Sequence, residues 1–176
     1  MKIGFKRLTD DAILPTKEHA SDSGFDLYAN EDVIIEPNET KLIKTGIAVH
    51  LPDGYEAQVR PRSGVTSKTK LIVQLGTIDN EYTGGIGIIV ENNTSVCCQD
   101  TPENFTLLNI KGGIHTDEDG SPMLHDYKVL NMSYLIKKGN KLAQLVVQEI
   151  PQTTAYEIHE IKDTERGSNG FGSSGY

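Results

Sequence analysis

The sequence has few aromatic side chains, few cysteines and no long apolar run, and each shortage excludes a class of protein. Aromatic residues are 6% of 176, so isoleucine, valine and leucine must build the core. No stretch approaches the length that spans a membrane, and residues 1–7 lack the apolar segment of a secretory signal. We therefore expect one domain with no membrane partner and with room for one large insertion.

Cysteine and histidine offer no metal site. The two cysteines, Cys97 and Cys98, are adjacent, and neighbouring cysteines rarely bridge each other and have no zinc-binding spacing. The five histidines are scattered without metal-like pairing. We expect two free thiols in a reducing cytoplasm and ordinary histidines.

Positive charge is also scarce. Lysine and arginine number 17 against 25 acidic residues, and the net charge of −8 argues against a nucleic-acid-binding surface. If the ligand is a polyphosphate, an acidic chain must supply local arginines and a divalent cation.

What the chain does have is a series of short β-rich runs separated by turn residues such as Asp53-Gly54. The expected strands are residues 32–36, 41–49, 55–59, 70–73, 85–90, 129–136, 141–150 and 155–161. No long segment keeps a convincing helical period. The pattern predicts an all-β sandwich or barrel.

Residues 92–128 interrupt this pattern. They contain a plausible helix start at residues 101–104, an apolar run at residues 105–110 and an acidic turn at residues 117–122. Because a structureless loop of this length is uncommon in a compact domain, we expect a small inserted subdomain. Such an insertion either serves a partner or packs on its own domain.

The last eleven residues, 166–176, are rich in glycine and serine and contain Arg166 and Phe171. This tail has too little apolar surface to form a core, and a disordered tail is one interpretation. The other is an arm that closes over a ligand. Its serine hydroxyls and backbone N–H groups suit phosphate oxygens, its arginine a terminal phosphate, and its aromatic ring a flat base.

Two further polar segments suit a nucleotide phosphate. In residues 21–27, Asp26 follows a glycine turn and can hold waters on a magnesium ion, although a plain turn is an equal alternative. In residues 60–64, Ser63 and Gly64 form a credible phosphate cradle. Arg62, directly before Ser63, is a candidate contact.

Residues 76–84 predict a hairpin whose backbone, including Gly76 and Ile78, can read a pyrimidine edge. Tyr82 can stack on a sugar and exclude a 2′-hydroxyl, and Asp79 can deprotonate a water. A surface hairpin with a structural tyrosine is the alternative. Residues 139–147 suggest a core strand in which Gln144 is the polar exception and a candidate phosphate contact.

In their order, the segments SDSGFDL, PRSG, GTIDNEYTG, GNKLAQLVV and RGSNGFGSSG resemble the five motifs of the deoxyuridine triphosphatase (dUTPase) family. The resemblance runs from Ser21 to the end of the chain, interrupted by the insertion. It implies a jelly-roll-like β barrel over residues 1–165, with the insertion at 92–128, and a flexible arm at 166–176. It also implies a homotrimer with shared active sites and Mg²⁺-assisted hydrolysis of dUTP to dUMP and pyrophosphate.

The resemblance also implies a role for each motif residue. Asp79 would activate the attacking water, Tyr82 would stack on the deoxyribose, and Asp26 would orient waters on magnesium. The remaining substrate contacts would be Arg62, Ser63, Gly64, Gly76, Ile78, Gln144, Arg166, Phe171, Gly172, Ser173 and Ser174.

Two departures from the family pattern matter. Val73 and Gln74 occupy a stretch where many relatives place a uracil-facing asparagine, and that contact transfers to neither residue. The insertion resembles the extra segment of some bacteriophage dUTPases, which implies a possible repressor partner from a mobile genetic island and a host-cell cytoplasmic location. The alternatives are a nucleotide-gated repressor-binding regulator without catalysis, and an enzyme related to dCTP deaminase.

Overall fold

The computed structural model describes residues 1–95, 107–121 and 132–168. Within them the regular secondary structure is almost entirely β strand. The elements are β1 (Gly4–Arg7), β2 (Gly24–Tyr28), β3 (Val33–Ile35), β4 (Thr40–Lys44), β5 (Ile47–His50), β6 (Tyr55–Pro61), α1 (Ser63–Thr66), β7 (Leu71–Val73), β8 (Gly76–Ile78), β9 (Gly87–Asn92), β10 (Tyr134–Ile136) and β11 (Lys141–Glu149). No helix in these ranges is long and apolar enough to cross a membrane.

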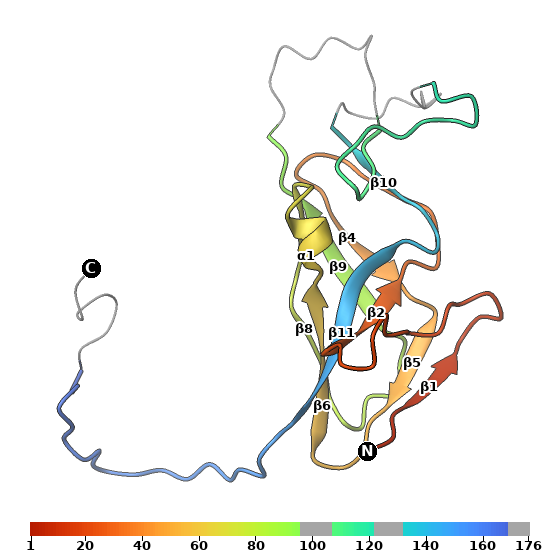
Figure 1. Cartoon of the computed structure of the whole chain (residues 1–176). Coiled ribbons are helices and arrows are strands. Elements are labelled where there is room, and N and C mark those ends of the chain that lie inside the picture. The colour runs from red at the N-terminus through yellow and green to blue at the C-terminus, as the bar shows by residue number, and fades with distance from the viewer. Residues whose placement is uncertain (96–106, 122–131, 169–176) are drawn as a thin grey trace.

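All pairings between these strands are antiparallel and form four sheets. The largest has the order β2-β11-β6-β8, and a second has the order β4-β9-β7. Strands β1-β5 and β10-β3 form two smaller ribbons. Figure 1 shows β11 crossing in front of β9, so the two larger sheets form opposing layers.

The apolar core lies between these layers and follows the period-two pattern of the strands. In β9, the residues Ile88, Val90 and Asn92 are buried, whereas Ile89 is exposed. From the other layer, β11 contributes Leu145, which is fully buried in the same core cluster. This arrangement confirms the predicted all-β, jelly-roll-like class, in which each sheet buries one face.

One predicted strand, residues 41–49, is divided into β4 and β5 by Gly46. Gly46 has φ +68°, and a Cβ atom there would lie 2.8 Å from the Ala12 Cβ. A side chain would therefore be both strained and in collision, so glycine is needed at this corner. The division turns the chain from the β4-β9-β7 sheet to the β1-β5 ribbon.

The predicted strand at residues 155–161 is wrong. Between β11 and Ser168, where the described part of the chain ends, there is no strand, and residues 151–168 are exposed. Figure 1 shows this segment leaving the domain as an extended arm. A strand needs a neighbour for its backbone hydrogen bonds, and the arm has none beside it within the described part of the chain. Strands β1 and β2 were not predicted as strands, because they are short and lack clear alternation.

The end of the insertion packs on the domain through β10. Leu107 is buried, the Leu108 N–H donates to the Ser133 carbonyl, and the Leu135 N–H donates to the Leu108 carbonyl. His115 contacts the Leu135 carbonyl through Nε2, and burial is the main cause that lowers the pKa of its ring. The predicted helix start at residues 101–104 and Cys97-Cys98 lie outside the described residues.

Asn92 fixes both ends of this insertion. It is fully buried, and its Nδ2 donates to the Ile35 carbonyl at 3.1 Å and to the Met132 carbonyl at 3.0 Å. Its Oδ1 accepts a hydrogen bond from Thr94 Oγ1 at 2.6 Å. One side chain thus joins β3, the last residue of β9 and the chain that enters β10.

The substitution Asn92→Ala should lower the free energy of unfolding by about 2–4 kcal/mol, because it leaves buried carbonyl groups without a donor. Urea denaturation at one fixed protein concentration measures the loss. Asn93→Ala is the matched control, since Asn93 is the exposed neighbour. Equal stability of the two variants would contradict this account of Asn92.

Candidate active site

The turn after β6 presents Ser63 and Gly64 to solvent. Val65 is buried and fixes the short helix α1 to the core, and the N–H groups of Val65 and Thr66 both donate to the Arg62 carbonyl. Ser63 and Gly64 are exposed, and a Cβ atom at Gly64 would meet nothing within 4 Å. The open space allows a ligand to approach the backbone at Gly64.

Asp26 lies directly behind this turn and joins three strands. Its Oδ1 is 2.9 Å from Arg62 Nε, an ion pair without hydrogen-bond alignment, and its Oδ2 is 2.9 Å from Lys141 Nζ. Arg62 Nη1 also donates to the Lys141 carbonyl at 3.1 Å. The hydrogen bond with Asp26 is the main cause that raises the pKa of Lys141. The side chain of Asp26 is only 7% exposed, so its carboxylate lies almost entirely out of contact with solvent.

Gln144 shares the face of Asp26. In the β2-β11-β6 ladder, Gln144 stands opposite Asp26 on one side and Arg60 on the other. Residues directly opposite each other point to the same face of a sheet. Gly24 leaves room for this side chain, since a Cβ atom there would lie 3.0 Å from Gln144 Cβ.

A cleft of about 300 Å³, here called the basic cleft, opens beside the turn. It is lined by Arg62, Gly64, Val65, Lys68, Ile110, Lys111, Gly139, Asn140 and Lys141. Two predicted contacts, Arg62 and Gly64, therefore lie together. The lysines were not singled out from the sequence, because no motif links Lys68, Lys111 and Lys141 along the chain.

The hairpin predicted at residues 76–84 is not a strand pair, because β8 pairs with β6 whereas β9 pairs with β4 and β7. The residues between β8 and β9 instead connect two sheets, and we keep the name hairpin for this connection. The Tyr82 N–H donates to the Asp79 carbonyl at 3.1 Å, and Tyr82 Oη donates to the Gly85 carbonyl at 3.2 Å. Gly84 permits this fold-back, because a Cβ atom there would lie 2.3 Å from Tyr82 Oη. Asp79 is exposed, and its carboxylate has no hydrogen-bond or ion-pair partner among the described residues.

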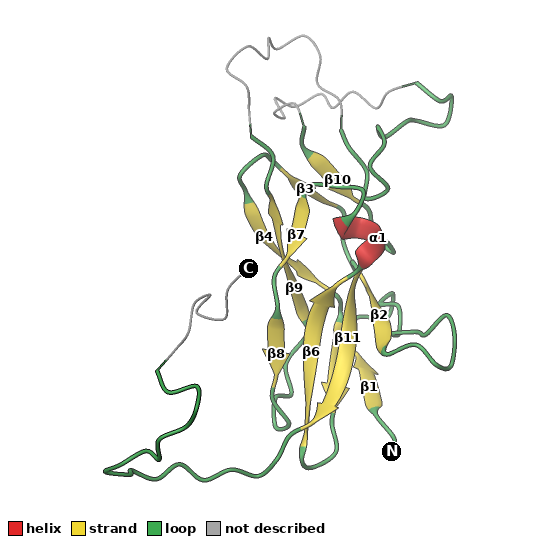
Figure 2. Cartoon of the chain, turned by 60° about the vertical axis from the view of Figure 1, so that its left-hand side comes forward, coloured by secondary structure: helices red, strands yellow, loops and turns green. Residues whose placement is uncertain are grey.

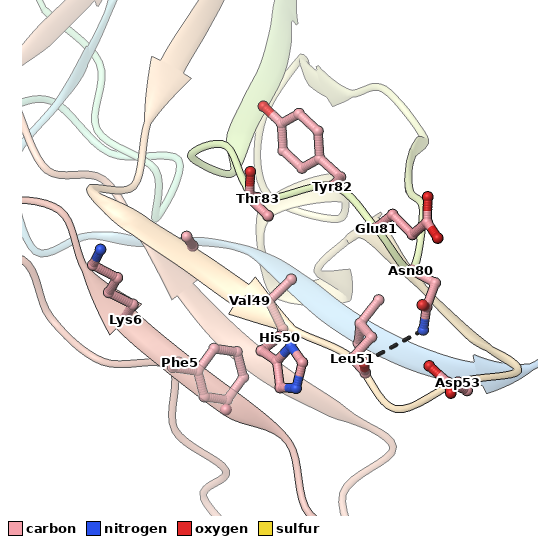
Figure 3. A pocket seen from close by; sticks show the side chains of 12 residues that line it. Phe5, Lys6, Val49, His50, Leu51, Asp53, Asn80, Glu81, Tyr82 and Thr83 are labelled. Carbon is pink, nitrogen blue, oxygen red and sulfur yellow. Dashed lines mark hydrogen bonds between the residues drawn. The ribbon is translucent and has the colours of Figure 1, made fainter.

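Two cavities border the hairpin. The hairpin pocket, about 530 Å³, is lined by Gly76, Ile78 and Tyr82 together with apolar groups that include Val59 and Ile86. A second pocket of about 620 Å³ lies beside the hairpin tip, between Asn80–Thr83 and the β1-β5 ribbon (Figure 3). Tyr82 lines both pockets, but the three predicted contacts Gly76, Ile78 and Tyr82 come together only in the hairpin pocket.

Val73 and Gln74 point elsewhere. Val73 is buried in the core, and Gln74 Nε2 donates to Glu91 Oε2 at 3.2 Å. Their packing agrees with the departure of this stretch from the family pattern.

The basic cleft lies beyond the end of β6, whereas the hairpin pocket borders the middle of this strand. Strand β8 pairs with β6 at Ala57 and Val59, whereas Ser63 follows the last residue of β6. Figure 2 shows β8 beside β6 and α1 above the upper end of β6. At 3.3 Å per residue, the backbone from Val59, which lines the hairpin pocket, to Arg62, which lines the basic cleft, spans about 10 Å. One chain therefore presents two separated half-sites.

The tail residues Phe171, Gly172, Ser173 and Ser174 lie outside the described residues. Arg166 is described and exposed, on the arm that leads away from the domain in Figure 1. No three His, Cys, Asp or Glu side chains in the described ranges come together to hold a metal. Asp26 is nevertheless suited to a water-mediated ion, because each carboxylate oxygen has a second lone pair beyond its cation contact.

Comparisons with known proteins agree with this geometry. The dUTPase family model matches residues 10–99 and 108–175. A deoxyuridine 5′-triphosphate nucleotidohydrolase from Clostridioides difficile is 39% identical, covering 97% of this chain and 96% of its own. One from Clostridium kluyveri is 38% identical and covers 99% of both chains.

The solved structures include two phage relatives. The Staphylococcus bacteriophage 80alpha dUTPase, as a point mutant with dUpNHpp, has a TM-score of 0.88 at 35% identity and covers 99% of each chain. A mutant dUTPase of phage phi11, with a structural Mg(II) ion, has a TM-score of 0.81 at 34% identity, covering 93% of this chain and 100% of its own. The 80alpha and phage 80 enzymes are connected with virulence-gene transfer and SaPI induction. With a family match over most of its length and relatives of this similarity, the chain belongs to the dUTPase family.

Proposed function

We propose that this protein hydrolyses dUTP to dUMP and pyrophosphate. The observation that carries the proposal is the pair of half-sites, one basic and one largely apolar, which match the two ends of a nucleoside triphosphate. Membership of the dUTPase family and the dUpNHpp held by the 80alpha enzyme give the same substrate class.

Each half-site has a separate task. In the hairpin pocket, the backbone of Gly76 and Ile78 reads the uracil edge and Tyr82 packs on the deoxyribose. Asp79, whose carboxylate is free of protein partners among the described residues, holds and deprotonates the water that attacks the α-phosphorus. Arg62 and Gly64 in the basic cleft bind the phosphates, together with Ser63 in the adjoining turn and Gln144 on the face of Asp26.

Magnesium completes the charge balance. A chain of net charge −8 that binds a polyphosphate gains from a divalent cation, which neutralises phosphate charge during the displacement. Asp26 is the protein group that would contact the waters on this ion, since the described residues form no cage of three ligands. Its ion pairs with Arg62 and Lys141 would hold the carboxylate in place.

The separation of the half-sites supports a shared site. Because the hairpin pocket and the basic cleft open at different positions along β6, we infer that a second copy brings its hairpin to this chain's basic cleft. A homotrimer satisfies this requirement with three equivalent sites. The arm then reaches a third region, where Arg166 meets the γ-phosphate, Phe171 covers the uracil, and Gly172, Ser173 and Ser174 bind phosphate.

The first test is pyrophosphate release from dUTP, dCTP, dTTP and UTP, each with and without Mg²⁺. We expect rapid, magnesium-dependent release from dUTP alone. Ammonia release from dCTP would instead assign the protein to the deaminase-related alternative. A folded protein that turns over none of the four would be a binding regulator.

Asp79→Asn should reduce kcat for dUTP by roughly 10²–10⁴-fold, the usual contribution of a general base. Binding of dUpNHpp, measured by calorimetry, should remain, because the amide keeps the size of the carboxylate. Asp53→Asn is the matched control, since Asp53 is an exposed carboxylate in the turn beside the same hairpin. Near-normal turnover by Asp79→Asn would rule out this base.

Deletion of residues 166–176 should cut turnover sharply and leave the assembly intact, because the arm acts as a lid rather than as part of the core. Turnover of dUTP and size-exclusion chromatography with light scattering are the two measurements. If the truncated chain changes its assembly state, the arm has a structural role instead.

We also propose that the protein binds a repressor of a mobile genetic island. The specific support is the insertion beside the basic cleft, together with the regulatory activity of the similar 80alpha enzyme. If both ligands use this face, dUpNHpp should lower the affinity for such a repressor in a calorimetric titration. An affinity that does not change with the analogue would contradict the coupling.

A further inference from the structure

The basic cleft has one wall that comes from the insertion. Ile110 and Lys111 line it, opposite the Ser63 turn and the Lys141 strand end. No acidic side chain is among its lining residues within the described part of the chain. Although the net charge of the chain is −8, four basic side chains line this cleft of about 300 Å³: Arg62, Lys68, Lys111 and Lys141.

Two of these four cations carry a charge that no acidic side chain of the described residues neutralises. Arg62 and Lys141 are engaged by Asp26, and Lys141 Nζ also lies 3.3 Å from Glu18 Oε2. Lys68 and Lys111 have no ion-pair partner among the described residues. Positive charge that is not neutralised by the protein attracts an anion.

The backbone that carries Lys111 is fixed. Asn109 Oδ1 accepts hydrogen bonds from the N–H groups of Lys111 at 2.9 Å and Gly113 at 3.3 Å, and its Nδ2 donates to the Ile114 carbonyl at 3.1 Å. The Gly112 N–H closes the turn on the Asn109 carbonyl.

The turn at residues 109–113 is also in close contact with the segment that follows α1. Ile110 packs on the main core cluster. Gly112 has φ +82°, and a Cβ atom there would lie 2.2 Å from the Lys68 carbonyl oxygen, so only glycine allows this approach. Core packing on one side and close backbone contact on the other place Lys111 at the cleft.

We propose that the insertion supplies Lys111 as a phosphate-binding residue, which with Lys68 extends the basic cleft into a subsite for the β- and γ-phosphates or released pyrophosphate. Asn109 is the positioning residue for Lys111. The assignment to the substrate's outer phosphates rests on the proposed function. The anion subsite itself rests on the cleft, its free cations and the fixed turn.

Calorimetric titration of the full chain with inorganic pyrophosphate, without Mg²⁺ and at low salt, tests the subsite directly. Lys111→Gln should weaken pyrophosphate binding on the order of fivefold, a loss appropriate to one partly exposed charged contact. Lys111→Arg should retain binding. Lys70→Gln is the matched control, because it removes the same charge from an exposed side chain outside the cleft. If Lys111→Gln and Lys70→Gln lose the same amount of pyrophosphate affinity, the loss comes from the change in net charge alone, and the proposal is overturned.

Steady-state kinetics with dUTP add an independent reading. Lys111→Gln should raise KM several-fold with kcat nearly unchanged, and dUMP affinity should not change, because the α-phosphate lies outside the subsite. Asn109→Ala should produce the same rise, and the double variant should show little additional loss, since both changes remove one contact. Additive losses would contradict a positioning role for Asn109.

The two proposals fail in different ways. A wild-type protein that binds pyrophosphate through Lys111 but does not hydrolyse dUTP would refute the enzymatic function and keep the subsite. A protein that hydrolyses dUTP while Lys111→Gln binds pyrophosphate like the wild type would keep the enzyme and refute the subsite.

Discussion

The contact on which the site depends is the buried carboxylate of Asp26 between Arg62 and Lys141. It joins β2, the end of β6 and the start of β11, which are separate in sequence but adjacent in the largest sheet. Removing one partner of such a group would leave a buried charge uncompensated, which is costly. The same carboxylate fixes the direction of Arg62 and therefore the edge of the basic cleft. Stability of the sheet and geometry of the phosphate site thus share one interaction.

Strand β6 determines how the chemistry is divided. It leads into the Ser63 turn at its end and pairs with β8 at its middle, so the two half-sites open at different positions along the strand. Under the proposed function, the base and the phosphate cradle of one active site would come from different copies of the chain. Assembly would then be a condition for catalysis, and the exposed arm after β11 extends away from its own domain.

The insertion contacts the rest of the domain in two places. Asn92 fixes its ends to β3 and the entry to β10 through buried hydrogen bonds. Its turn at residues 109–113 contacts the backbone of Lys68 and reaches the cleft through Lys111. Under the proposed function, a segment in such close contact with the phosphate-binding turn would respond to nucleotide, and this contact would couple substrate binding to the proposed protein partner.

Local patterns in the sequence determined the strand-rich class, most strand positions, and the polar segments around Asp26, Ser63, Asp79 and Gln144, because alternation, turn residues and motif order are written along the chain. The tertiary structure decided what these patterns could not. It placed Gly46 at a corner that splits one predicted strand, and left residues 155–161 without a partner strand. It also gathered Lys68, Lys111 and Lys141 from distant positions into one cleft. Such proximity depends on how the sheets fold over one another, and no local pattern records it.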